Sequence, residues 1–346
     1  MESVNKLILV SPLPPPIGGI SSWTVEVMER MPLLGCETLL VNSGIVGKRV
    51  ENVNKVSIFD EIKRTLAIKK KIKAFLKTEN TRTIHYNASC FTMGLIRDAM
   101  ILFSFRKKAD IFYHCHCNLD TNINNGVARF FFKVICKASK KVLALNKNSL
   151  SLAQKYTDKA VIIPNFIDKV YADMPSINEN LKKIAFVGRV TETKGVVELL
   201  EAAKEISDVD FYIIGPEESN IVERYKAENI IYQGAKPHDE VLEILKTMDA
   251  LILPSYSEGF PLVVLEAMAC ALPIISTPVG SVPDMIEEEG GVFIKLKDIE
   301  SIKEAVEKIK DKEIRLKMAQ YNLEKVKREY LSETVLKNLL EIYSEA

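Results

Sequence analysis

Short apolar runs alternate with helical stretches along the whole chain, and this alternation constrains the fold more than any other feature of the sequence. A strand, a helix and then another strand predict a parallel sheet with helices packed on its faces. The expected fold class is therefore α/β, with the same alternation in both halves. We expect strands at residues 7–10, 39–41, 83–86, 110–116, 142–145, 183–189 and 250–254.

The length of 346 residues is long for one hydrophobic core and suits two domains of about 170 residues each. We expect a first domain at residues 1–170, a linker at 171–182, a second domain at 183–325 and a charged C-terminal helix at 326–346. The six cysteines lack CxxC spacing, which fits reduced thiols in the cytosol. No apolar run approaches the roughly 18 residues that cross a bilayer. The expected location is therefore cytoplasmic, either soluble or peripheral on the inner face of the cell membrane.

Charge is divided unevenly between the two halves. Residues 1–170 carry 26 Lys and Arg against 13 Asp and Glu, whereas residues 171–346 carry 21 against 33. A basic helical segment of the first half interleaves its lysines with Ile62, Leu66, Ile72 and Leu76. This segment can lie on an anionic membrane surface, or pack its apolar side on the core of its own domain, and the sequence leaves both open. Nucleic acid is not an expected partner, because no aromatic platforms are interleaved with basic strands.

Two carboxylates, Glu258 and Glu266, follow the apolar run 250–254 in a predicted strand-loop-helix unit. Pro261 suits the first helical turn, because its missing N–H is not needed there. Glu258 then lies in the loop and Glu266 in the helix, within reach of one crevice. The free amides and positive dipole end of such a helix favour phosphate. We expect the helix to turn Leu262, Val263 and Leu265 toward the sheet.

A second strand-to-helix loop carries Gly188 and Arg189 at its start and Lys194 and Gly195 at its end. The guanidinium offers a planar fork and the ammonium a compact charge, and this pair suits a diphosphate. Either cation alone would be an ordinary surface charge. Together with the two carboxylates, the loop predicts a site for a phosphorylated ligand.

The run His114-Cys115-His116-Cys117 invites a metal site, but strand alternation places the two histidines on one face and the two cysteines on the other. A zinc site with four ligands would need both faces at once, so no metal is expected there. His116 is the better functional candidate, because it stands at the carboxyl end of its strand, where open α/β sheets bind ligands. His114 is the alternative candidate for this functional histidine.

The stretch from residue 186 to 284 resembles the retaining nucleotide-sugar glycosyltransferases of family 4, a glycogen-synthase-like group with the GT-B architecture. The resemblance implies two Rossmann-like domains whose parallel sheets face across a cleft, with the acceptor on the first, the nucleotide sugar on the second and a C-terminal helix that returns to the first. The motifs that carry it are Gly188-Arg189 to Lys194-Gly195, Tyr212-Ile213-Ile214-Gly215, the pair of Glu258 and Glu266, and Thr277-Pro278-Val279-Gly280.

The same resemblance implies roles for single residues. Arg189 and Lys194 would bind the donor diphosphate, Glu266 the ribose and Glu258 the transferred sugar. His116 matches the active-site histidine of the family's first domain, so that the expected catalytic set is His116, Glu258, Arg189 and Lys194. Cationic side chains and helix amides would stabilise the leaving diphosphate, and neither a metal nor a cofactor is expected. The remaining expected donor-binding residues are Gly18, Gly19, Gly188, Gly259, Phe260, Pro261 and Leu262.

By family frequency the expected donor is a UDP-sugar, followed by GDP-sugars, and the expected acceptor is a glycan or a polyprenyl-linked oligosaccharide of surface polysaccharide synthesis. Ala271 departs from the family pattern, which has glycine there, and Ser281 and Asp284 replace a glycine and a glutamate. If position 271 needs a left-handed backbone, alanine lowers the free energy of unfolding by about 1 kcal/mol relative to glycine.

Two other function classes stay open at this point. A nicotinamide-dependent oxidoreductase would need a GxGxxG motif after the first strand, and the pair of Gly18 and Gly19 does not supply it. A non-catalytic nucleotide-sugar-binding protein of the same fold would keep the motifs without turnover, and only an assay of donor hydrolysis or transfer separates it from an enzyme.

Overall fold

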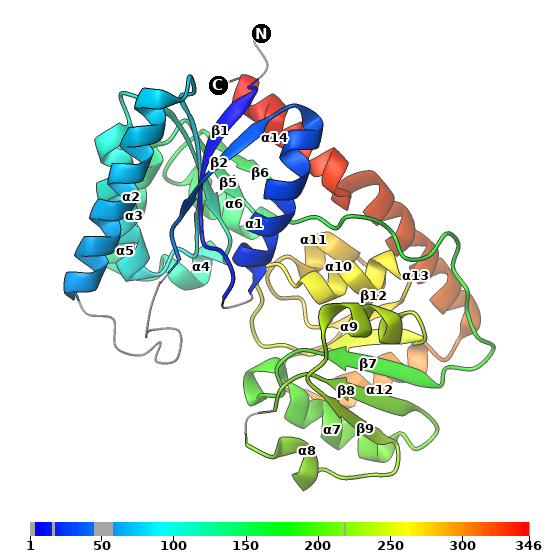
Figure 1. Cartoon of the computed structure of the whole chain (residues 1–346). Helices are drawn as coiled ribbons and strands as arrows, with labels where there is room; N and C mark the ends of the chain where they lie inside the picture. The colour runs from blue at the N-terminus through cyan, green and yellow to red at the C-terminus, as the bar shows by residue number, and fades with distance from the viewer. Residues whose placement is uncertain (1–3, 16–17, 45–57, 218, 346) are drawn as a thin grey trace. The chain divides into compact units, whose positions relative to one another are not determined.

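Figure 1 shows the computed structural model of the chain, which describes residues 4–15, 18–44, 58–217 and 219–345. The chain divides into two units, of which unit 1 comprises residues 1–165 and 333–346 and unit 2 comprises residues 166–332. Each unit is built on a parallel six-stranded sheet with helices on its faces. The α/β class predicted from the alternation of strands and helices is confirmed.

The strands of unit 1 have the order β2-β1-β3-β4-β5-β6 and are all parallel. β1, β3 and β4 are buried along nearly their whole length, which is why they read as continuous apolar runs in the sequence. The strands expected in this half are present, and β6 is added to them. Their bounds are β1 Lys6–Ser11, β2 Glu37–Asn42, β3 Thr83–Ala88, β4 Asp110–Cys115, β5 Lys141–Ala144 and β6 Ala160–Ile162.

Helices α2, α3 and α5 cover one face of this sheet (Figure 1). Ile72 of α2, Leu95 of α3 and Phe132 of α5 join Ile84 and Tyr86 of β3 in one apolar core. Their crossovers all move along the sheet in the same direction, so right-handed connections leave them on the same side. The helices of unit 1 are α1 Gly19–Arg30, α2 Ile58–Thr78, α3 Thr92–Phe105, α4 Leu119–Asn122, α5 Gly126–Ala138, α6 Lys147–Gln154 and α14 Ser332–Ser344, with a 3-10 turn η1 Met31–Leu34.

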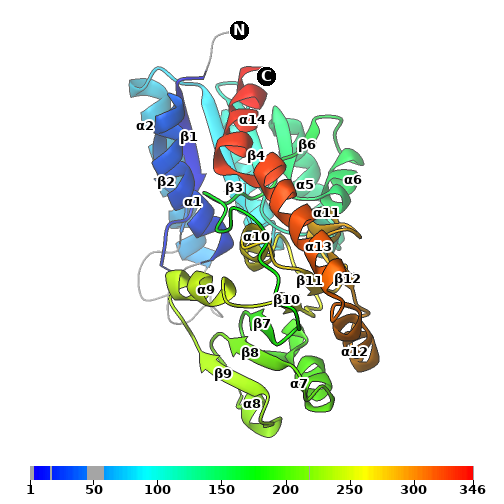
Figure 2. The ribbon, with the colours of Figure 1, turned by 90° about the vertical axis from the view of Figure 1, so that its right-hand side faces the viewer.

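Helices α1 and α14 lie against the opposite face, and Figure 2 shows α14 across β3 and β4. Trp23 of α1 stacks on His85 with ring centroids 5.1 Å apart, and Tyr343 of α14 meets Phe112 at 4.7 Å. The return of the C-terminal helix to the first domain, which the family resemblance implied, is therefore confirmed.

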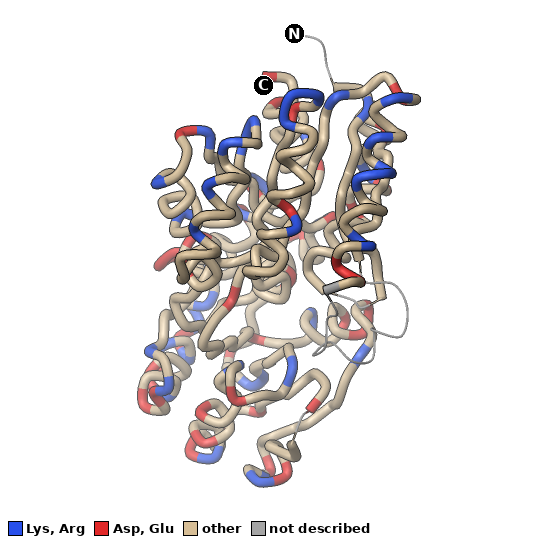
Figure 3. The backbone as a smooth tube through the Cα atoms, turned by 90° about the vertical axis from the view of Figure 1, so that its left-hand side faces the viewer, with Lys and Arg blue, Asp and Glu red and all other residues tan. Residues whose placement is uncertain are grey.

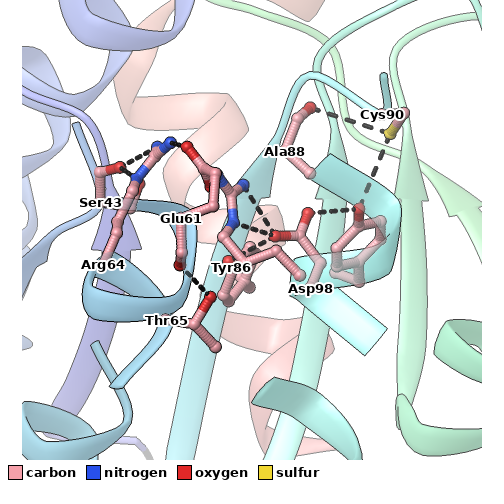
Figure 4. Close-up of polar contacts among 10 residues, drawn as sticks. Ser43, Glu61, Arg64, Thr65, Tyr86, Ala88, Cys90 and Asp98 are labelled. Carbon is pink, nitrogen blue, oxygen red and sulfur yellow. Dashed lines mark hydrogen bonds and ion pairs between the residues drawn. The ribbon is translucent and has the colours of Figure 1, made fainter. Parts of the chain in front are cut away.

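A buried carboxylate, Asp98, ties α3 to the sheet on the α2, α3 and α5 side (Figure 4). Asp98 accepts hydrogen bonds from the hydroxyls of Tyr86 (2.6 Å) and Tyr113 (2.9 Å) and from the guanidinium of Arg97 (2.8 and 2.9 Å). Arg97 also lies 3.7 Å from Glu61 of α2. Burial raises the pKa of both tyrosines, and the nearby Asp98 raises it further, so that both hydroxyls keep the protons they donate.

Unit 2 has a parallel sheet with the strand order β12-β11-β10-β7-β8-β9. Its central strand β7 lies between β10 and β8, and β10 is wholly buried. The strands are β7 Lys183–Val187, β8 Asp210–Ile214, β9 Ile230–Gly234, β10 Ala250–Leu253, β11 Ile274–Ser276 and β12 Gly291–Phe293. The helices are α7 Val196–Glu205, α8 Ile221–Arg224, α9 His238–Leu245, α10 Leu262–Ala269, α11 Val282–Ile286, α12 Ile299–Lys308 and α13 Lys312–Lys325, with the short turns η3 Glu192–Lys194 and η4 Val326–Tyr330.

The segment expected as a linker, residues 171–182, packs on unit 2. The amide of Tyr171 donates to the carbonyl of Ala269 at 2.8 Å, and the buried Arg315 of α13 donates to the carbonyl of Asn178 at 2.7 Å. At the other end, residues 326–332 also belong to unit 2, and the chain passes into unit 1 at Glu333. Among the described residues, every helix is too short or too polar to span a bilayer.

Candidate active site

Three loops meet at the carboxyl edge of the unit 2 sheet, after β7, β10 and β11. The amide of Tyr256 donates to the carbonyl of Thr193 at 3.0 Å and joins the β10 loop to the β7 loop. The amide and hydroxyl of Ser281 both donate to the carbonyl of Gly259, at 2.9 and 2.8 Å, and join the β11 loop to the β10 loop. Ser281, which departs from the family glycine, thus holds the loop that carries Glu258.

Glycines let these loops approach one another closely. Gly195 has a φ of +68°, and a Cβ there would lie 2.1 Å from the carbonyl oxygen of Pro254. Gly280 has a φ of +60°, and a Cβ there would lie 2.1 Å from the carbonyl oxygen of Glu258. An L side chain fits neither position, because both the backbone angle and the space exclude it.

The geometry brings Lys194 and Glu258 together. Lys194 Nζ lies 2.6 Å from Glu258 Oε1, and the two side chains are only 23% and 11% exposed. Lys194 ends the 3-10 turn η3, and Glu258 stands in the loop before α10, as the sequence predicted. A partly desolvated ion pair fixes both groups, since each charge would be costly to leave alone.

Glu266 lies on α10, and its Oε1 is 3.0 Å from Nε2 of His238. His238 was not predicted from the sequence as a site residue. The one local indication was that it follows Pro237, and the structure places it at the first residue of α9. Pro261 is the residue before the helix and not its first turn. Of the three residues expected to face the sheet, Leu265 is buried, whereas Leu262 and Val263 are only half-buried; the helix also buries Val264, which was not expected.

Arg189 lies at the start of the β7 loop and lines a pocket of about 330 Å³. Thr191, Glu192, Thr193 and Arg224 share its lining, so the pocket is bordered mainly by polar and charged residues. Gly188 precedes it with a φ of +157°. Among the described residues, no cluster of three or more His, Cys, Asp or Glu side chains has an arrangement that could hold a metal ion.

In unit 1, His116 follows the carboxyl end of β4 and is half-buried, whereas its rival His114 is fully buried. His116 Nε2 lies 2.9 Å from Asn87 Oδ1, and His85 Nε2 lies 2.8 Å from the same oxygen, so both imidazoles are within hydrogen-bond distance of it. Burial lowers the pKa of His116 to about 3, and the nearby His85 lowers it further, so the imidazole is neutral at pH 7. His85 and Asn87 were missed, although they share a face of β3 by strand alternation.

The predicted alternation along β4 is confirmed. The rings of His114 and His116 are 4.0 Å apart on one face, whereas Cys115 and Cys117 approach Cys90 on the other. All six cysteines are free.

Gly18 and Gly19 open α1 in unit 1, and the amide of Gly18 donates to the hydroxyl of Ser21 at 2.9 Å. A Cβ at either glycine would meet nothing within 4 Å. Within the described residues, space therefore remains beside this turn, unlike at the crowded Gly195 and Gly280 of unit 2.

Comparisons with known proteins agree with these features. The family profile "Glycosyl transferases group 1" matches residues 171–326, which lie within unit 2. The glycosyltransferase MJ1178 of Methanocaldococcus jannaschii is 31% identical over 56% of this chain and 56% of its own length. TuaC of Bacillus subtilis, whose name assigns it to teichuronic acid biosynthesis, is 33% identical over 37% of this chain and 33% of its own length. These two matches span about half or less of the relatives' own lengths.

A longer match joins nearly the whole chain to the N-acetyl-alpha-D-glucosaminyl L-malate synthase of Bacillus anthracis, with 26% identity over 95% of this chain and 94% of that protein. The fold is similar to that of Anabaena HepE in its complex with UDP-glucose, with a TM-score of 0.76 and 14% identity over 99% of this chain and all of HepE. The chain therefore has the GT-B fold, and its residues 171–326 match the group 1 glycosyltransferase family.

Proposed function

We propose that this chain is a retaining glycosyltransferase that moves a sugar from a UDP-sugar to a glycan or lipid-linked oligosaccharide in the synthesis of a surface polysaccharide. The observation that carries the proposal is the Lys194 to Glu258 pair, held at 2.6 Å where the loops after β7, β10 and β11 are pinned together. This arrangement places a fixed cation beside a fixed carboxylate at the ligand-binding edge of a parallel sheet.

The two charges suit the two ends of a sugar–phosphate bond. As that bond breaks, negative charge grows on the diphosphate, and Lys194 and Arg189 would stabilise it without a large rearrangement. Glu258 already accepts from Lys194 and has further lone pairs for hydroxyls of the transferred sugar. Glu266, with its position fixed by His238, would take the ribose hydroxyls. Gly259, Phe260, Pro261 and Leu262 would complete the donor site, together with Gly188.

Unit 1 would supply the acceptor side. His116 is neutral at pH 7 and oriented by Asn87, so it would position a hydroxyl and not form a covalent intermediate. The open space in front of Gly18 and Gly19 leaves room for a diphosphate or an acceptor close to the backbone. The UDP-sugar is supported by the complex of HepE, and the surface polysaccharide by the name of TuaC.

The test is turnover of a panel of UDP-sugars and GDP-sugars, measured as release of the nucleoside diphosphate and as transfer of labelled sugar. We expect Lys194→Ala to lower turnover by about two to three orders of magnitude, the size of losing one transition-state charge contact. Lys246→Ala is the matched control, because Lys246 forms an ion pair with Glu243 and a cation–π contact with Tyr171, neither of which is an expected site residue. Equal turnover of the Lys194 variant would remove this residue from the mechanism, and no turnover by the natural protein would favour the non-catalytic binding protein.

A further inference from the structure

Large apolar side chains stand in solvent on the face of unit 1 formed by α2, α3 and α5. Phe59 and Leu66 of α2 are 76% and 60% exposed, Phe103 of α3 is 52% exposed, and Phe130 of α5 is 62% exposed. Single exposed apolar residues are ordinary, but a group on three neighbouring helices marks an interaction surface. We name this surface the α2-α3-α5 face.

Lysines continue the apolar stripes along the same helices. On α2 the residues 59, 62, 66, 70, 73 and 77 recur at steps of three and four, so Phe59, Ile62 and Leu66 share one stripe with the lysines at the last three positions. On α5 the positions 127, 130, 133 and 137 repeat this order of two apolar residues and two lysines. α3 is followed directly by the basic run at residues 106–108.

The charge of the face is strongly positive. Residues 58–78, 92–108 and 126–141 together hold 16 Lys and Arg and only three acids, Asp60, Glu61 and Asp98. Glu61 and Asp98 are already paired with Arg64 and Arg97. Figure 3 views this side of the molecule and shows blue positions recurring along its helices. Within the described part of the chain, the stripe lysines of α2 and α5 make no ion pair.

For the basic helix α2, the sequence left two interpretations open, namely contact with a membrane and packing on the core of its own domain. The structure supports packing for one part of the helix and leaves the other part exposed. Ile72 is fully buried and Leu76 is half-buried against the core of unit 1, whereas Ile62 and Leu66 face solvent. The apolar side of α2 thus packs on its own domain, and a second apolar stripe remains outside.

We propose that the α2-α3-α5 face docks on an anionic phospholipid bilayer, with its exposed apolar side chains in the interface and its lysines on the lipid phosphates. Apolar area and basic charge together are what such binding requires, and neither alone gives stable attachment. The core of a protein interface is depleted in lysine, so a second protein fits this surface less well. The inference goes beyond the proposed function and does not depend on which sugar is transferred.

The exposed apolar side chains of the α2-α3-α5 face lie toward the carboxyl edge of the unit 1 sheet. The amino-terminal ends of α2 and α5, where the apolar side chains gather, follow the carboxyl edge of the sheet, because each helix runs back along the strand before it. His116 stands at that same edge. The bilayer surface would therefore lie near the end of unit 1 that carries His116.

The test is sedimentation of the full chain with vesicles of phosphatidylcholine alone and with vesicles of phosphatidylcholine and phosphatidylglycerol in equal parts. We expect binding to the anionic vesicles at low salt and release at about 1 M NaCl, where the Debye length falls to about 3 Å. The triple variant Lys70→Gln, Lys73→Gln and Lys77→Gln should weaken partition about a hundredfold, which is about 1 kcal/mol for each lysine.

A second variant, Phe59→Ser with Leu66→Ser and Phe130→Ser, should weaken partition at least tenfold as an order of magnitude, because each change removes area from the interface. Leu33→Ser is the matched control, because Leu33 is 81% exposed in η1, outside the three helices, and should bind normally. Unchanged unfolding, followed by Trp23 fluorescence, verifies that the variants are folded. The proposal is overturned if the natural chain does not sediment with anionic vesicles, if the serine variant binds equally well, or if the serine changes instead abolish a dimer seen by sedimentation equilibrium.

Discussion

Gly280 and Gly234 have nearly the same left-handed backbone, yet the structure makes very different demands on them. Their φ angles are +60° and +69°, but a Cβ would strike the carbonyl of Glu258 at Gly280 and meet nothing within 4 Å at Gly234. We expect Gly234→Ala to cost about 1 kcal/mol of stability through strain alone. Gly280→Ala should cost at least about 1 kcal/mol more and should also lower donor turnover, because the Glu258 loop must move.

Urea unfolding and nucleotide release from a UDP-sugar, measured on both variants, separate the two effects. Equal stability and equal turnover of the two variants would mean that the close approach of the β10 and β11 loops does not matter.

Asp98 is a single residue on which several buried groups depend. Asp98→Ala would leave the guanidinium of Arg97 without its closest carboxylate and the hydroxyls of Tyr86 and Tyr113 without their acceptor. We expect a loss of about 3 to 5 kcal/mol, the usual result of removing one partner of a buried charge pair. Tyr113→Phe is the milder comparison and should cost about 1 kcal/mol, since it removes one hydrogen bond. Denaturant unfolding measures both, and a loss below that of Tyr113→Phe would show that water replaces the carboxylate.

A residue type that does not suit its backbone conformation could be recognised from the sequence. The side chain that a site residue contacts on another element could not. The condition stated for Ala271 is met, because its φ is +57°, and its side chain is buried against Ala319 and Leu323 of α13; the expected stability cost of alanine there stays a prediction. The pairing of Lys194 with Glu258 joins loops 64 positions apart, and no local pattern specifies such a contact. The same holds for His238 beside Glu266.

At the scale of elements, β3 and β4 carry the buried His85 and His114, and the half-buried His116 follows β4; the titration of these three histidines links stability to pH. Burial lowers the pKa of His85 to about 4 and that of His116 to about 3, and it lowers the pKa of His114 well below its usual value. In the unfolded chain each has a pKa near 6.5, so between about pH 6.5 and about pH 4 the unfolded state binds protons that the folded state does not. Acidification should therefore lower the free energy of unfolding, by up to about 1.4 kcal/mol per pH unit for each histidine.

This pH dependence can be measured by urea unfolding between pH 7 and pH 5, followed by the fluorescence of Trp23, the single tryptophan, which stacks on His85. His114→Gln should reduce the slope by about one third, because one of the three histidines that stay neutral in the folded state is removed. A natural chain whose stability is flat across this range would show that the histidines stay neutral in both states.

Strands were easier to predict than the limits of helices and linkers. Strands buried on both faces leave continuous apolar runs, so β1, β3, β4 and β10 could be located from sequence. The start of α10 was placed one residue early, because proline suits both the first turn and the position before it. Residues 171–182 are polar like a linker, and only their contacts with Ala269 and Arg315 assign them to unit 2.

At the scale of the whole molecule, two sheets of six strands each present a carboxyl edge, and the two units divide the predicted site residues between them. Gly18, Gly19 and His116 belong to unit 1, whereas the cations and carboxylates of the predicted donor site belong to unit 2. The family profile also matches unit 2 alone. The sequence implied this division only through resemblance, because the alternation of strands and helices is the same in both halves.

Hydrogen exchange with and without a UDP-sugar tests which unit holds the nucleotide. We expect slower exchange at the amides of the β7, β10 and β11 loops, residues 188–195, 254–261 and 277–281, because a ligand at 100 times its Kd stabilises the state it binds by about 2.7 kcal/mol. The core of β3 and β4, residues 83–88 and 110–115, serves as the internal reference and should exchange at an unchanged rate. A nicotinamide dinucleotide at the same concentration should protect neither set, since the loop after β1 lacks its fingerprint. Protection confined to the Gly18 and Gly19 turn, with the unit 2 loops unaffected, would place the nucleotide in unit 1 and contradict the proposed donor site.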